Sequence, residues 1–171
     1  MRTGTAPLIT IRRTQIEDRE PIRAILEDTD VFNRDEIEIA MELIDAFLSD
    51  PNKNDYNVYS AIDPEGDVVG YTCIGPTPLT DGTFDLYWIA VKPSTHQRGI
   101  GKELLKYSED LAGAHGGRLL IAETSSQPKY ENTRAFYLRN SYLEIARIKD
   151  YYKIGDDLVV YGKYLSQHRG T

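Results

Sequence analysis

The chain has 171 residues, a length typical of one domain of about 100–200 residues, so we expect a single domain over residues 1–171. Its composition is globular, with 40% apolar and 27% charged residues, which excludes wholesale disorder. The formal net charge of −7 disfavours a nucleic-acid partner, and the lack of a long apolar run or a signal peptide predicts a cytoplasmic protein with no membrane partner.

A strand and a helix are predicted at the start of the chain. Alternating apolar residues over 8–12 indicate the strand. Thr14 and Glu17 have the spacing of a capping box, with Asp18 as the alternative cap, so we expect the helix to begin here. Its buried face is expected to contain Ile22, Ile25 and Leu26.

A second helix is predicted over residues 33–49, because Glu36 follows Asn33 at the spacing of a helix start. Three strands are expected after it, over 56–62, 68–75 and 83–92. The segment 63–66 contains Pro and Gly, which are typical of a tight turn, so the first two of these strands should form an antiparallel hairpin.

The second half of the chain alternates helices and strands. Helices are expected over 99–114 and 131–140, and strands over 118–124, 143–151 and 158–165. The order of elements predicts a mixed α/β (α+β) domain whose central sheet has about seven strands, mostly antiparallel, with about four helices. The strand–helix–strand unit at its centre should place its two strands parallel.

The segment that joins the strand ending near Val91 to the next helix has the features of an anion site. Backbone N–H groups at a helix N-terminus are unpaired, and the helix dipole adds positive potential. Gly99 and Gly101 allow a phosphate to approach the backbone closely, and Arg98 and Lys102 add positive charge. The alternative interpretation is a plain strand-to-helix turn. The spacing matches neither a P-loop nor a dinucleotide fingerprint.

No metal site is expected from the cysteine and histidine content. Cys73 is the only cysteine, so no internal disulfide or CxxC cluster can form. The three histidines, His96, His115 and His168, lie far apart in the sequence.

Three successive segments of the chain together resemble the GNAT superfamily of N-acetyltransferases. In that family a strand leads into [Gln/Arg]-x-x-Gly-x-[Gly/Ala] at the start of a helix, and the matching residues here are His96-Gln97-Arg98-Gly99-Ile100-Gly101. His96 departs from the family pattern, which bears on a side-chain contact from that position and not on the backbone. The likeness continues through the strand 118–124 and the segment 132–142.

The resemblance implies transfer of an acetyl group from acetyl-CoA to an amine, with two splayed parallel strands admitting the coenzyme. The backbone of the loop would hold the pyrophosphate, through Gln97, Arg98, Gly99, Ile100, Gly101 and Lys102. Main-chain groups of the preceding strand would pair with the pantetheine, namely those of Ile89, Ala90 and Val91. Asn132 would contact the pantetheine, the alternative being a helix N-cap. Tyr137 would be the general acid for the departing thiolate, the alternative being a packing aromatic.

An amine must lose a proton before it attacks, and two carboxylates are candidates for the base. The resemblance suggests Asp85, acting through a water, and Glu123 on the neighbouring strand is the alternative. A third reading uses ordered water and no residue. A period of two places Asp85, Tyr87, Ile89 and Val91 on one face of their strand.

The expected acceptor is a small-molecule amine or an amino-acid-like compound. The alternatives are a peptide or protein N-terminus and a non-catalytic module that binds acetyl-CoA. Residues 147–157 either rim the acceptor pocket or are strand ends around a turn. Acidic residues of the second helix form either a solvated face or an acidic mouth for a cationic amine: Asp35, Glu36, Glu38, Glu42 and Asp45. Family members are often dimers, and these residues do not decide whether this chain forms a homodimer.

Overall fold

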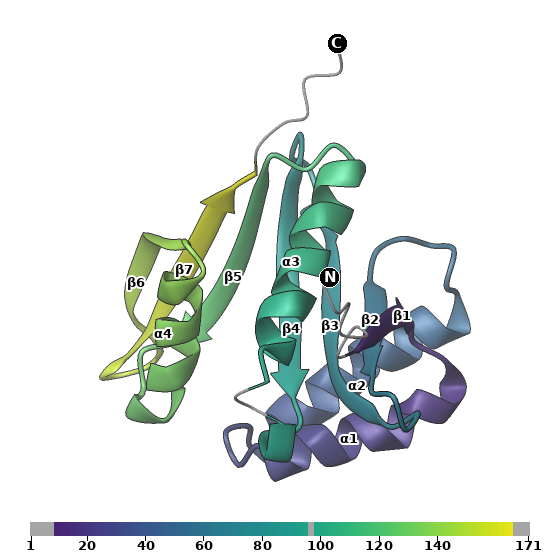
Figure 1. Cartoon of the computed structure of the whole chain (residues 1–171). Helices are drawn as coiled ribbons and strands as arrows, with labels where there is room; N and C mark the ends of the chain where they lie inside the picture. Colours follow the sequence, from purple (N-terminus) through teal and green to yellow (C-terminus); the bar gives the residue numbers. More distant parts are fainter. Residues whose placement is uncertain (1–8, 96–97, 166–171) are drawn as a thin grey trace, which may run out of the picture.

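The computed structural model describes residues 9–95 and 98–165, which form a single sheet with helices on both faces (Figure 1). The described part contains the α-helices α1 (Arg19–Asp28), α2 (Arg34–Ser49), α3 (Ile100–Ala114) and α4 (Glu131–Arg139). Its strands are β1 (Thr10–Arg13), β2 (Asn57–Ile62), β3 (Val68–Pro76), β4 (Thr83–Val91), β5 (Leu119–Ser125), β6 (Leu143–Lys153) and β7 (Asp156–Tyr164). Short 3-10 turns precede three of the helices: η1 (Ile16–Asp18), η2 (Pro93–Thr95) and η3 (Pro128–Tyr130).

The sheet confirms the predicted mixed architecture. Its strand order is β1-β2-β3-β4-β5-β7-β6, and β4 and β5 are its parallel neighbours. Helices α1 and α2 cover one face of the sheet, and α3 and α4 lie on the other, with α4 over the β5 and β7 side (Figure 1). No helix of the described part is long and apolar enough to cross a membrane.

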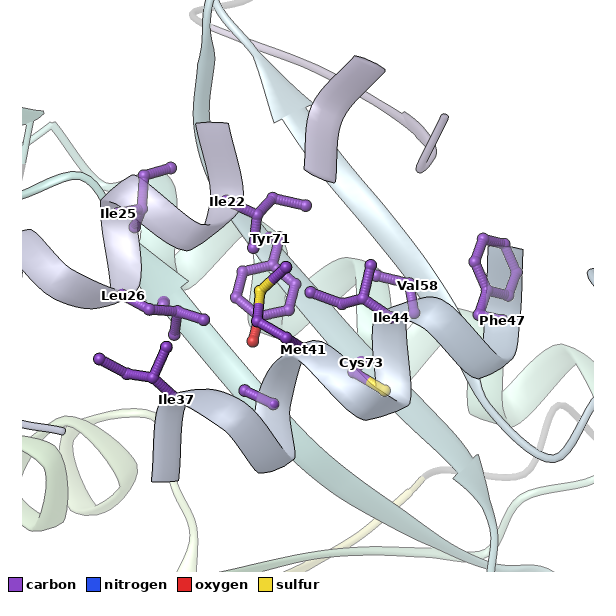
Figure 2. Close-up of a cluster of buried hydrophobic side chains, with 12 residues drawn as sticks. Ile22, Ile25, Leu26, Ile37, Met41, Ile44, Phe47, Val58, Tyr71 and Cys73 are labelled. Atoms are coloured by element: carbon purple, nitrogen blue, oxygen red, sulfur yellow. The ribbon is translucent and has the colours of Figure 1, made fainter. Parts of the chain in front are cut away.

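The layer formed by α1 and α2 is held to the sheet by a buried apolar cluster. Figure 2 shows Ile22 and Leu26 of α1 and Met41 and Ile44 of α2 around Tyr71 of β3. Each of these five side chains is almost completely buried. Full burial of one apolar side chain stabilises a fold by about 1.5–3 kcal/mol, so this cluster fixes α2 against the sheet. The predicted inward face of the first helix is confirmed.

Helix α2 begins at the predicted place, with a capping box. The Asn33 side chain accepts the N–H of Glu36 at 2.9 Å, and Glu36 Oε2 accepts the N–H of Asn33 at 2.7 Å. Only one carboxylate oxygen of Glu36 is used by the cap. Its Oε1 atom is therefore available to a second partner.

The first helix does not begin at Thr14, because Thr14 directly follows β1 and bonds to β2. Its N–H donates to the carbonyl of Val58, and its hydroxyl contacts Ser60 Oγ at 2.8 Å. Asp18, the alternative cap, is the N-cap residue of α1, although its side chain does not cap the helix and instead accepts the N–H of Gln15 at 2.9 Å. The capping-box prediction for Thr14 is wrong because a buried hydroxyl at the edge of a sheet takes its partner from the neighbouring strand.

The alternation predicted for β4 is interrupted by a β-bulge. The register with β3 shifts after Leu86 and leaves Tyr87 as an extra residue. Tyr87 and Trp88 both pack on the cluster beneath α1 and α2, whereas Ile89 and Val91 pack on the side of α3. One shared face was predicted for Asp85, Tyr87, Ile89 and Val91, and the bulge makes that prediction wrong.

Candidate active site

Strands β4 and β5 are paired only at their N-terminal ends. Their parallel register ends at Asp85 and Ile121. Beyond it, β4 continues to Val91 beside β3 and β5 continues to Ser125 beside β7, so the two strands diverge (Figure 1). The predicted splayed pair is confirmed. The three residues for which a pantetheine pairing was predicted pair with β3 and lie past the last β4–β5 pair: Ile89, Ala90 and Val91.

The first turn of α3 has the backbone features of an anion site. Gly99 is the N-cap residue, with a φ of 77°, and makes no side-chain cap. Its carbonyl accepts the N–H of Glu103, whereas the N–H groups of Ile100, Gly101 and Lys102 have no acceptor among the described residues. A Cβ added at Gly99 would meet nothing within 4 Å. Open backbone donors beside an unfilled space suit a diphosphate.

The side chains around this turn differ in their environment. Arg98 and Lys102 are exposed, and neither makes an ion pair with another described residue. Gly101 is packed, because a Cβ there would lie 3.3 Å from the Phe136 ring of α4. Gln97, for which a coenzyme contact was predicted, and His96 lie outside the described residues.

Asn132 lies in the first turn of α4 with an exposed side chain. The N-cap of α4 is Tyr130, so the alternative interpretation of Asn132 as the helix cap is wrong. Its amide makes no hydrogen bond with any described residue. The side chain is thus available for a ligand.

Tyr137 of α4 is buried among other aromatic residues. Its ring stacks on Tyr161 of β7, with centroids 5.6 Å apart and 23° between the planes, and lies 5.5 Å from the ring of Tyr142. Its hydroxyl has no hydrogen-bond partner within residues 9–95 and 98–165. Burial raises the pKa of Tyr137 well above its usual value, so the phenol stays protonated at neutral pH.

The two candidate bases lie at the narrow end of the opening. Asp85 Oδ2 accepts the hydroxyl of Thr77 at 2.6 Å. Burial and the charge of Asp85 raise the pKa of Tyr87 to about 12. Partial burial, and then the charge of Asp85, also raises the pKa of Glu123. Asp85 and Glu123 are therefore close enough to interact electrostatically, and a carboxyl with a raised pKa is suited to proton transfer near neutral pH.

Tyr130 and Glu36 join two distant parts of the chain, and no sequence motif assigned either residue to the site. The Tyr130 hydroxyl donates to Glu36 Oε1 at 2.5 Å, across a sequence separation of 94 residues. Burial and this hydrogen bond raise the pKa of Tyr130. In the sequence, Glu36 was singled out as part of the helix start and as one acid of a helix face. No local sequence pattern marks its contact with a residue this far along the chain.

Tyr152 of β6 was also missed as an individual site residue. Partial burial and the charge of Glu123 raise its pKa, and the charge of Glu36 adds to the effect. Tyr152 therefore lies within electrostatic reach of both acids. Residues 147–157 had been singled out in the sequence only as a segment that either rims the acceptor pocket or ends two strands.

The loop that carries Tyr130 is fixed by a buried carboxylate. Asp156 of β7 accepts hydrogen bonds from Ser125 Oγ and from Gln127 Nε2, both at 2.5 Å. Burial alone would raise the pKa of Asp156, but these hydrogen bonds outweigh it and the pKa is lowered. The carboxylate is thus ionised and holds the end of β5 to β7.

Cysteine chemistry is not available in this chain. Cys73 is fully buried in β3, and burial raises its pKa to about 12, so its thiol is not ionised at neutral pH. No group of three or more His, Cys, Asp or Glu within residues 9–95 and 98–165 is placed to hold a metal ion.

Comparison with known proteins agrees with this geometry. The model of the Acetyltransferase (GNAT) family matches residues 19–142. A solved structure from Desulfovibrio desulfuricans, described as an acetyltransferase of the GNAT family, is 38% identical, with a TM-score of 0.88, and the match covers 92% of this chain and 99% of that one. A search of curated proteins found no match.

Two further solved structures share the fold at lower identity. An aminoglycoside 6'-N-acetyltransferase complexed with coenzyme A is 14% identical, with a TM-score of 0.71, and the match covers 94% of this chain and 99% of that one. The ribosomal-protein-S18-alanine N-acetyltransferase from Escherichia coli is 19% identical, with a TM-score of 0.70, over 92% and 94% of the two chains. With the family model spanning most of the chain, this protein belongs to the GNAT family of acetyltransferases, enzymes of acyl transfer that use acetyl-CoA.

Proposed function

We propose that the protein transfers the acetyl group of acetyl-CoA to the primary amine of a small cationic molecule by direct attack of the amine. The observation that carries this proposal is the pair of carboxylates, Asp85 and Glu123, at the narrow end of the β4–β5 opening. Tyrosines and a further acid, Glu36, lie toward the wide end. Negative charge with aromatic side chains is the chemistry that attracts an ammonium group.

Binding of the coenzyme would use the backbone of α3 and β4. The open N–H groups of Ile100, Gly101 and Lys102 would donate to the diphosphate, and Arg98 would add positive charge. Main-chain groups of Ile89 to Val91 would hydrogen-bond the pantetheine as a neighbouring strand does. When bound, the coenzyme supplies a thioester whose carbonyl carbon the amine attacks.

Proton transfer would begin at the carboxylates. An ammonium group has no lone pair, so one of its protons must leave before the C–N bond can form. Glu123, whose pKa is raised, or Asp85 would accept that proton, directly or through a water. The nitrogen lone pair then forms the C–N bond, and the C–S bond breaks with its electron pair going to sulfur. The nitrogen gives up a second proton, which balances the proton that the leaving sulfur takes up.

Tyr137 would stabilise the departing thiolate. Its phenol remains protonated at neutral pH and has no partner among the described residues, so it can donate a hydrogen bond to sulfur and deliver a proton as the thiol leaves. A route through an acetylated cysteine is not supported, because Cys73 is buried and protonated.

The choice of a small acceptor rests on the contacts at the wide end. The hydrogen bond between Tyr130 and Glu36 crosses the side on which the amine would enter, which favours a compact cleft over a groove open to a peptide. The solved structures of the same fold are described as acting on an aminoglycoside and on a ribosomal-protein alanine, both of which offer amines.

One experiment separates the three candidate functions. Release of free thiol from acetyl-CoA is measured with a panel of small diamines, amino acids and peptides, and coenzyme binding is measured by calorimetry. We expect binding and turnover on small cationic amines. Turnover only on peptides would favour the N-terminal acetyltransferase, and binding without turnover would favour a non-catalytic module.

A further inference from the structure

A row of aromatic side chains joins the two sides of the β4–β5 opening. Phe32, in the turn between α1 and α2, packs edge-on against Trp88 of β4, with ring centroids 4.8 Å apart. Phe32 also lies 6.5 Å from the ring of Tyr130, in the turn that follows β5. The Tyr130 hydroxyl then bonds to Glu36 of α2. The row therefore runs from β4, through the α1–α2 turn, to the segment beyond β5.

Both ends of the Glu36–Tyr130 hydrogen bond are held in place by other contacts. Glu36 is fixed through its cap with Asn33, and Lys129 Nζ lies 3.8 Å from its other carboxylate oxygen. Tyr130 is only 7% exposed, and Asp156 anchors the loop that precedes it. Since other contacts already hold both side chains in place, forming the hydrogen bond costs little conformational entropy. We therefore expect the row of aromatic side chains to be rigid.

We infer that the Glu36–Tyr130 hydrogen bond and the Phe32–Trp88 contact form the outer wall of the acceptor cleft and set the length of amine that the enzyme acetylates. This inference rests on the function proposed above. The pantetheine would occupy the opening beside residues 89–91. The amine reacts near Asp85 and Glu123, so the rest of the acceptor extends along the α1–α2 face of the opening, toward Phe32 and Trp88. A compact diamine ends before the wall, whereas a longer polyamine meets it.

The test compares acceptors of one chemistry and increasing length. Initial rates are measured with ethylenediamine, spermidine and spermine for the wild type, Tyr130→Phe and Tyr130→Ala. We expect the ratio of kcat/KM for spermine to that for ethylenediamine to rise about tenfold in Tyr130→Ala, where the wall is removed. In Tyr130→Phe only the hydrogen bond is lost, and we expect a rise of about threefold.

A matched control is Tyr164→Ala, which removes an exposed tyrosine near the end of β7 and should leave the ratio unchanged. A purely structural role of Tyr130 would lower the rates for all three amines together, and the ratio would stay constant. A constant ratio in folded Tyr130→Ala overturns the inference, and if that variant does not fold, a constant ratio in Tyr130→Phe does so. Failure of the wild type on every amine overturns the proposed function instead.

Discussion

Tyr137 and Tyr161 stack with their ring centroids 5.6 Å apart and their planes inclined by 23°. The stack holds the Tyr137 ring by contact with one of its faces, and the Tyr137 hydroxyl has no hydrogen-bond partner among the described residues. We therefore predict that Tyr137→Phe keeps the fold and lowers kcat by about 10²-fold, because only the proton donor is removed. The KM for the amine should change little. Steady-state kinetics and a thermal melt check both parts.

Tyr161→Phe is the matched control for Tyr137. It removes one hydroxyl from the other ring of the same stack, so packing is equally preserved. We expect its kcat to remain near the wild-type value. Equal losses of kcat in the two variants would show that the stack, and not the Tyr137 hydroxyl, is what catalysis requires.

The raised pKa of Glu123 predicts opposite effects on activity and stability. If Glu123 is the base, it works only when ionised, so kcat/KM should rise with pH through a pKa above the usual 4.5. The folded state favours its protonated form, so its contribution to stability is present below the unfolded pKa and is lost as pH rises through the folded one. We predict that Glu123→Gln abolishes this acid limb of the profile of kcat/KM against pH. At pH 7 the melting temperature of the variant should equal or exceed that of the wild type.

Asp85→Asn separates the two candidate bases. The Asp85 charge raises the pKa of Glu123, so its removal should shift the acid limb of the wild-type profile to lower pH when Glu123 is the base. Loss of the limb in Asp85→Asn but not in Glu123→Gln would assign the base to Asp85. A limb that survives in both variants would favour ordered water.

Gly99 gives a direct test of the coenzyme site. Its φ of 77° and the empty space beside it allow a close approach to the first amides of α3. We predict that Gly99→Ala raises the Kd for coenzyme A about tenfold, since the new Cβ occupies that space and the backbone strain of about 1–2 kcal/mol disturbs the turn. Calorimetry measures the Kd.

Gly66 provides the control with the same backbone strain. It has a φ of 94° and nothing within 4 Å of an added Cβ, and it lies in the β2–β3 hairpin. Gly66→Ala should destabilise the fold to a similar extent while the Kd stays at its wild-type value. A Kd that rises equally in both variants would mean that general destabilisation, and not the α3 turn, weakens binding.

The parts of the fold that the sequence predicts are those governed by local chemistry. The Asn33–Glu36 capping box is a four-residue pattern, and the hairpin after β2 follows from its Pro and Gly. The bulge at Tyr87 was not predictable from alternation, because it is set by how β4 packs against β3 and the two helical layers. Thr14 matched a cap pattern but pairs with Ser60, a contact between residues far apart in sequence.

The residues of the candidate site also fall into two groups, those that belong to a local sequence motif and those brought together by long-range contacts. The loop before α3 and the segment around Tyr137 carry a motif, so residues of the coenzyme side can be proposed from the sequence alone. The acceptor side depends on contacts such as Tyr130 with Glu36, which no spacing rule predicts. Acceptor choice is therefore the property for which the three-dimensional structure adds most.

The partly buried ion pair of Asp18 and Arg12 should dominate the acid stability of the N-terminal half. Asp18 is 3% exposed and accepts from Arg12 Nη1 and Nη2 at 2.6 and 2.9 Å and from Ser60 Oγ at 3.0 Å. Burial alone would raise the pKa of Asp18, but the hydrogen bonds, chiefly that from Arg12, lower it. Its stabilisation is present above the unfolded pKa of about 3.9 and is lost as pH falls through the lower folded value.

We predict that Asp18→Asn lowers the free energy of unfolding at pH 7 by about 2 kcal/mol, because the buried Asp18 side chain then loses its charge-assisted hydrogen bonds from the partly exposed Arg12. The exposed pair Lys106–Asp110 supplies the control, and Asp110→Asn should change stability by less than about 0.5 kcal/mol. Urea unfolding at pH 7 and at steps of pH from about 5 down to below the unfolded pKa of about 3.9 measures both. The difference between Asp18→Asn and the wild type should shrink as the pH falls, because the wild type loses the ionised Asp18. A difference that stays constant over this range would show that the ion pair is not what Asp18 contributes.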